Sequence, residues 1–67
     1  MKNKIKVQRA IKNITQEELA DALKISRQTV NAVELNKYTP SLLLGLRMAR
    51  FFGVPLDDLF ILEEEDI

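Results

Sequence analysis

The chain has 67 residues, no histidine and no cysteine, and equal numbers of acidic and basic residues. A domain of this size buries only about 60% of the surface of its unfolded chain, which argues against a large catalytic cleft. Histidine and cysteine are the commonest metal ligands, and they supply the imidazole base and the thiolate nucleophile of many enzymes. We therefore expect one domain that is not an enzyme and that has no cofactor or metal.

The charges are unevenly distributed along the chain. Residues 1–50 contain all ten basic residues and four acidic ones, a net charge of +6, whereas residues 51–67 contain the other six acidic residues. A basic body with an acidic end suits a nucleic-acid partner, although a solvated surface with a chance asymmetry would give the same counts. No run approaches the roughly 18 apolar residues of a membrane span, and the basic start lacks the apolar core of a signal peptide. We expect a cytoplasmic protein without a membrane partner.

The first predicted helix covers residues 4–12 and ends at Asn13, a residue that tolerates the left-handed backbone of a helix stop. The residues expected to face inward are Ile5, Ala10 and Ile11. Arg9 on this helix is a candidate partner for Glu34, which ends a later predicted helix. Such a pair would matter only if it is partly buried, since exposed pairs contribute about 0 to 1 kcal/mol.

Residues 15–34 are predicted to form two short helices joined by a tight turn. Thr15 can cap the first helix, with Glu18 completing a capping box, and Ser26 can cap the second. The residues expected to face the core are Leu19, Ala20 and Leu23 in the first helix and Val30 and Val33 in the second. Because only residues 24–26 separate the helices, they should cross steeply as a helix-turn-helix.

Two further helices are predicted at residues 40–52 and 55–60. Thr39 followed by Pro40 is expected to start the longer one, and Gly53 to end it. The core face of the longer helix should hold Leu42, Gly45, Leu46, Ala49 and Phe52. The acidic end of the chain is either a frayed tail or contains a short strand. The prediction is therefore an all-α fold of five helices, with a short terminal pair of β-strands as an option.

The outer face of the second motif helix has side chains suited to reading base edges in a DNA major groove. Arginine can pair with guanine, glutamine and asparagine with adenine, and alanine with the methyl group of thymine. The predicted base contacts are Arg27, Gln28, Asn31 and Ala32. The predicted contacts to the DNA backbone are Gln16, the amide of Asn36, Lys37 and Tyr38. Each residue alone is more often a solvated surface residue, so the prediction depends on their combination with the two-helix motif.

A second apolar stripe on the helix at 40–52, together with the last helix, predicts a homodimer. The stripe consists of Leu44, Met48, Phe51, Leu56, Leu59 and Phe60. One protomer of this size cannot readily bury them all, so we expect an interface within the segment 42–67. The alternative is that the tail folds back over part of this surface. Two-fold symmetry would place the two groove-reading helices about 34 Å apart, which requires a nearly palindromic site.

Four segments are more specific than any single residue: TQEELADAL at 15–23, SRQTVNAVE at 26–34, NKYTPS at 36–41 and FGVPLDDLF at 52–60. Together they resemble the lambda-repressor-like, XRE-type helix-turn-helix family, particularly its short stand-alone transcriptional regulators. The resemblance implies a five-helix domain that binds double-stranded operator DNA as a homodimer, with its third helix in the major groove.

The resemblance also assigns roles to individual residues. It implies backbone contacts from Gln16, Ser26, Lys37 and Tyr38, and base contacts from Arg27, Gln28, Asn31 and Ala32. It further implies a pair between Arg9 and Glu34 and, as in some short relatives, paired chain ends with a strand at 61–64. The chain departs from the family at Lys24, where glycine is common. A lysine in a left-handed turn should cost about 1 kcal/mol.

We therefore expect a sequence-specific transcriptional regulator, more specifically a repressor, formed by a helix-turn-helix domain over residues 1–67 with its motif at 15–34. An alternative is an antitoxin that binds a protein toxin through the acidic, apolar C-terminal end and also represses its own operon. An enzyme that uses Asp57, Asp58 and residues 63–65 as paired carboxylates is least favoured, because those residues look solvated or helix-capping.

Overall fold

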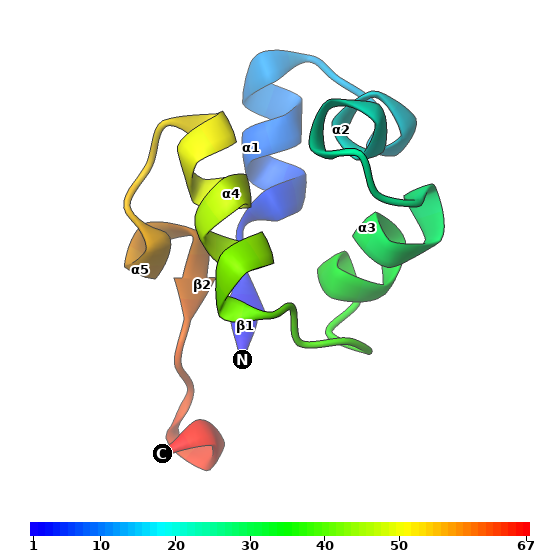
Figure 1. The fold of residues 1–67 in the computed structure, drawn as a ribbon. Helices are drawn as coiled ribbons and strands as arrows, with labels where there is room; N and C mark the ends of the chain where they lie inside the picture. The colour runs from blue at the N-terminus through cyan, green and yellow to red at the C-terminus, as the bar shows by residue number, and fades with distance from the viewer.

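The computed structural model describes all 67 residues, which form five α-helices and a two-stranded antiparallel sheet (Figure 1). The helices are α1 (Ile5–Lys12), α2 (Gln16–Leu23), α3 (Arg27–Glu34), α4 (Leu42–Phe52) and α5 (Leu56–Leu59). The strands are β1 (Lys2–Asn3) and β2 (Phe60–Ile61), and a 3-10 turn follows at Glu64–Asp66. The predicted five-helix fold with a terminal strand pair is thus confirmed. None of the helices has the length and hydrophobicity that crossing a membrane requires.

The start of α2 and the ends of α1 and α2 lie where the sequence predicts them. The Glu18 N–H donates to Thr15 Oγ1 at 3.0 Å, and the Thr15 N–H donates to Glu18 Oε1 at 2.9 Å, which completes the capping box of α2. Asn13 and Lys24 both adopt the left-handed conformation, with φ of 56° and 57°, and end α1 and α2. Residues that cap or stop a helix therefore define the motif.

The start of α4 differs from the prediction. Ser41, not Thr39, is the N-cap, because its hydroxyl accepts the Leu44 N–H at 3.1 Å, and Pro40 precedes the helix. Both Thr39 and Ser41 can cap a helix, so residue type alone does not choose between them. Pro55 is likewise the N-cap of α5 rather than its first helical residue.

The chain ends are joined rather than frayed. Lys2 pairs with Ile61 and Asn3 with Phe60 in the antiparallel sheet, so the strand lies at residues 60–61 and not at 61–64. Beyond the sheet, the Met1 ammonium lies 3.2 Å from Glu63 Oε1 and 2.9 Å from Asp66 Oδ2. The hydrogen bond with Asp66 raises the pKa of the Met1 amino group, and the same bond lowers the pKa of Asp66.

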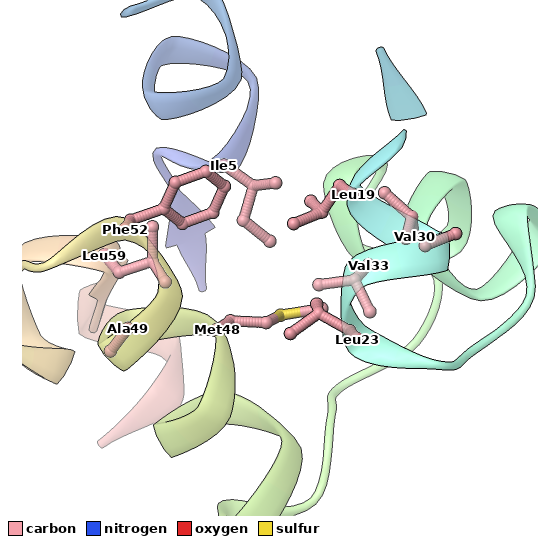
Figure 2. Close-up of a cluster of buried hydrophobic side chains, with 10 residues drawn as sticks. Ile5, Leu19, Leu23, Val30, Val33, Met48, Ala49, Phe52 and Leu59 are labelled. Carbon is pink, nitrogen blue, oxygen red and sulfur yellow. The ribbon is translucent and has the colours of Figure 1, made fainter. Parts of the chain in front are cut away.

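One hydrophobic core lies between all five helices (Figure 2). The buried residues are Ile5, Leu19, Ala20, Leu23, Val30, Val33, Met48, Ala49, Phe52 and Leu59. In Figure 2 the side chain of Met48 extends from α4 toward Leu23 of α2. The two motif helices thus turn their predicted apolar faces inward and pack on α4.

Four core predictions are wrong. Ala10 and Ile11 are exposed, since α1 turns Ile5 and the side of the helix that carries Arg9 toward the core. Leu42 and Leu46 are 70% and 48% exposed. The buried face of α4 instead follows an i, i+3, i+4, i+7 spacing and consists of Gly45, Met48, Ala49 and Phe52.

Burial within the protomer corrects part of the predicted dimer stripe. Met48 and Leu59 have no exposed surface, so they belong to the core of the protomer and cannot form a contact with a second chain. The other four residues of the stripe are half-buried and pack against the core; they are Leu44, Phe51, Leu56 and Phe60.

An ion pair connects α1 to the end of α3, as predicted. Arg9 Nε and Nη2 donate to Glu34 Oε2 and Oε1 at 2.6 and 3.0 Å. Arg9 Nη1 also donates to the carbonyl oxygen of Ile14 at 3.1 Å. The hydrogen bonds to Glu34 raise the pKa of Arg9. The two side chains are only 15% and 7% exposed, so solvent screens this pair less than a surface pair.

The left-handed turn at Lys24 predicts that Lys24→Gly stabilises the protein. Glycine adopts this backbone conformation without strain, so the free energy of unfolding should rise by about 1 kcal/mol. Urea unfolding measures the change. Ala22→Gly, inside α2 and exposed, is the control and should lower stability by about 1 kcal/mol. Equal effects of the two substitutions would contradict the assigned strain.

The Arg9–Glu34 pair predicts that Arg9→Ala lowers the free energy of unfolding by about 2 to 3 kcal/mol. This is somewhat less than the loss of one partner from a fully buried pair, because the pair keeps some exposure. Urea unfolding at one protein concentration measures it. Lys6→Ala, on the exposed side of α1, should change stability by at most about 0.5 kcal/mol. A loss no larger than that of Lys6→Ala would show that the pair does not hold α1 on α3.

Candidate DNA-binding surface

The turn between α2 and α3 holds the two helices at a steep angle (Figure 1). The Ile25 N–H donates to the Ala20 carbonyl oxygen at 3.0 Å, which closes the end of α2. Ser26 Oγ then accepts the Thr29 N–H at 3.0 Å and lies 2.8 Å from Thr29 Oγ1, which caps α3. The cap predicted for Ser26 is confirmed, and its hydroxyl lies at the exposed N-terminus of α3.

The inner and outer faces of α3 divide as their spacing predicts. Val30 and Val33 are buried, whereas Arg27, Gln28 and Asn31 are exposed. Gln16, Arg27, Gln28 and Asn31 together line an open concavity of about 270 Å³ that contains no apolar residue. Four of the predicted contacts therefore share one polar surface that is formed by α3 and the start of α2. Ala32 is half-buried and lies outside this concavity.

A chain of hydrogen bonds orients the side chains of this surface. Gln16 Nε2 donates to Asn31 Oδ1 and to Glu34 Oε1, at 3.1 Å in each case. Glu34 is itself fixed by Arg9. The network thus runs from α1 through Glu34 and Gln16 to Asn31, and it preorganises a residue that is predicted to contact bases.

The loop after α3 is compact. Asn36 adopts the left-handed conformation with φ of 60°. Its N–H donates to the Val33 carbonyl oxygen at 3.1 Å, and the Lys37 N–H donates to that of Ala32 at 2.9 Å. The backbone amide of Asn36 is therefore engaged within the protein, and only its side-chain amide is left for a phosphate. Lys37 and Tyr38 are exposed, as a contact to the DNA backbone requires.

Two residues without a role in the sequence analysis attach other elements to the helix-turn-helix that forms this polar surface. Asn3 Nδ2 lies 3.0 Å from the Val33 carbonyl oxygen and 3.1 Å from Asn36 Oδ1, which ties β1 to the end of α3. Arg47 Nη2 donates to the Leu23 carbonyl oxygen at 2.5 Å, which ties α4 to the motif turn. These partners are 24 to 33 residues apart, so no local pattern signals them.

Comparison with known proteins agrees with this geometry. A family model described as Helix-turn-helix matches residues 5–59. An uncharacterized HTH-type transcriptional regulator of Methanocaldococcus jannaschii is 53% identical over 98% of this chain and 100% of its own length. One from Bacillus subtilis is 46% identical over 98% and 100% of the two chains, and one from Archaeoglobus fulgidus is 43% identical over 100% and 94%. The chain therefore belongs to the XRE-type helix-turn-helix family of DNA-binding transcriptional regulators.

Proposed function

We propose that this protein is a sequence-specific repressor that binds a palindromic operator as a homodimer, with α3 in the major groove. The observation that carries the proposal is the shared polar concavity of Gln16, Arg27, Gln28 and Asn31, formed by the outer face of α3 and the start of α2. A bound dimer would exclude other proteins from overlapping DNA, which is repression by occupancy. Since the ligand is operator DNA, we place the protein's action in the cytoplasm.

The proposed readout divides into base and backbone contacts. Arg27 donates two hydrogen bonds to guanine, Gln28 pairs with adenine, and Asn31 contacts the adjacent base edge. Ala32, which is half-buried, offers only its methyl group to a thymine. The contacts to the DNA backbone come from Ser26, Asn36, Lys37 and Tyr38, and from the backbone N–H of Gln16 at the start of α2. The side-chain NH₂ group of Gln16 already donates to Asn31 and Glu34.

The proposed dimer uses a patch of three exposed leucines on α4. Leu42, Leu43 and Leu46 are 70%, 70% and 48% exposed. Beside them lies an apolar concavity of about 160 Å³. Its lining includes Pro40, Leu42, Gly45, Leu56 and Phe60. A second copy that places the same leucines against this surface would bury apolar area on both protomers, as an isologous interface does. Of the residues in the predicted stripe, this interface still includes Leu56 and Phe60.

The antitoxin alternative has a narrower basis. Leu62 and Ile67 are 66% and 95% exposed within the acidic end of the chain, a composition that suits a basic, partly apolar protein partner. In-vitro selection from a random duplex library separates the two functions. A palindromic winner that is bound far more tightly than random DNA supports the repressor. Absence of enrichment contradicts it and favours a protein partner.

The base contact of Gln28 predicts that Gln28→Ala weakens binding to the selected operator by about 1 to 3 kcal/mol and relaxes preference at one base pair. Affinities for the operator and its single-base variants measure both effects. Lys37→Ala is the matched comparison, because loss of a phosphate contact should weaken binding to all sequences alike and lower the salt slope by about 0.9 per protomer. Equal losses on every sequence for Gln28→Ala would contradict its role.

The leucine patch predicts that Leu42→Asp with Leu46→Asp converts the dimer to a monomer. Both side chains are exposed in the protomer, so the charges should oppose association without unfolding the domain. Analytical ultracentrifugation at micromolar concentration measures the mass. The control is Leu35→Asp with Leu62→Asp, two exposed leucines outside the patch, which should leave the dimer intact. Unchanged sedimentation of the first variant would refute this interface.

A further inference from the structure

A second concavity lies beside the end of α3, on the side of the terminal sheet. It is open and measures about 600 Å³. Its lining includes Lys2, Asn3, Lys4, Glu34 and Asn36. Lys2 belongs to β1, Lys4 is the N-cap of α1, and Asn36 belongs to the loop that also carries Lys37. The fold thus brings the N-terminal lysines next to the loop that is proposed to contact the DNA backbone.

The charge of this concavity is positive. Lys2 and Lys4 are exposed, and neither forms an ion pair. Glu34 is the only acidic residue in the lining, and its carboxylate is already bound by Arg9 at 2.6 and 3.0 Å. Neither ammonium group is therefore engaged by a carboxylate. An acceptor with negative charge and several oxygen atoms is the ligand that such a pair of ammonium groups attracts.

The position of the two lysines is fixed relative to α3. Asn3 stands between them in the chain, and its side-chain amide bonds Val33 and Asn36 at the end of α3. Asn3 Oδ1 also accepts the Ile5 N–H at 3.2 Å, which fixes the start of α1. The backbone that carries Lys2 and Lys4 is thus attached to the groove-reading helix.

We propose that Lys2 and Lys4 bind phosphates of the operator next to the phosphate held by Lys37, so that the DNA interface extends beyond the helix-turn-helix to the N-terminal strand. This inference rests on the proposed function. The contact is to the DNA backbone and is independent of base sequence. It places the terminal strand pair at the DNA surface, with Asn3 as the residue that positions it.

The test is the salt dependence of operator binding by the full chain. Each phosphate contact contributes about 0.9 to the slope of log affinity against log salt concentration, so Lys2→Ala with Lys4→Ala should lower the slope by about 1.8 per protomer. Affinity should fall by a similar factor on operator and random DNA, with base preference unchanged. Lys2→Arg with Lys4→Arg should keep the slope of the wild type.

The matched control removes two positive charges elsewhere. Lys12 lies 5.6 Å from the centre of the Phe51 ring, and Arg50 precedes that ring on α4. Lys12→Ala with Arg50→Ala should leave the slope within the error of the wild type. An equal decrease in both double variants would show a general effect of net charge and would overturn the proposal.

Two other outcomes separate this inference from the proposed function. If Lys37→Ala lowers the slope and Lys2→Ala with Lys4→Ala does not, the DNA function stands and the additional contact is refuted. If the wild-type protein selects no sequence and shows no salt-dependent DNA binding, both proposals fail. Lys2→Gln with Lys4→Gln removes the same two charges but keeps longer side chains than alanine does. It replaces the alanine variant if circular dichroism shows that the alanine variant is unfolded.

Discussion

The ion pair between Arg9 and Glu34 determines where the candidate DNA surface lies relative to the rest of the molecule. It holds α1 against the end of α3, and Glu34 in turn accepts a hydrogen bond from Gln16. Burying charges costs free energy that the attraction between them only partly offsets, so a largely buried pair is better explained by the geometry that it specifies than by net stability. Here that geometry aligns three helices around the residues of α3 that are proposed to contact bases.

Local signals in the sequence were sufficient for the motif and insufficient for α4. The Thr15 and Glu18 capping box and the left-handed stop at Asn13 involve partners within four residues, and the period of the α-helix places the two valines on the inner face of α3. The left-handed turn at Lys24 was expected from the family resemblance. Leucines surround α4 on several sides, so periodicity alone does not reveal which side meets α2. The side of α4 that faces inward is fixed by the tertiary contact of Met48 with the core. Leu42 and Leu46 are left exposed as a result.

The candidate site likewise has residues that the sequence predicts and residues that it does not. The period of an α-helix places Arg27, Gln28 and Asn31 on one exposed face, and the structure brings Gln16 to them. Asn3 escaped prediction because its acceptors lie at the far end of α3, and a two-residue strand has too little pattern to be recognised. The bonds of Asn3 to Val33 and Asn36 are long-range contacts, and they bring basic residues of the N-terminus to the proposed DNA surface.

The bond between Gln16 and Asn31 also has a direction. Glu34 is an acceptor without a proton to give, so the group that Gln16 turns toward it must be the NH₂ group. The same NH₂ group faces Asn31, which must therefore present its oxygen inward, and its own NH₂ group points away from the protein. The carboxylate of Glu34 thereby determines that Asn31 presents a hydrogen-bond donor on the exposed surface of α3. In the proposed complex, Asn31 would meet the DNA as a donor that is already aligned, which favours a base edge rich in acceptors, such as the N7 and O6 atoms of guanine.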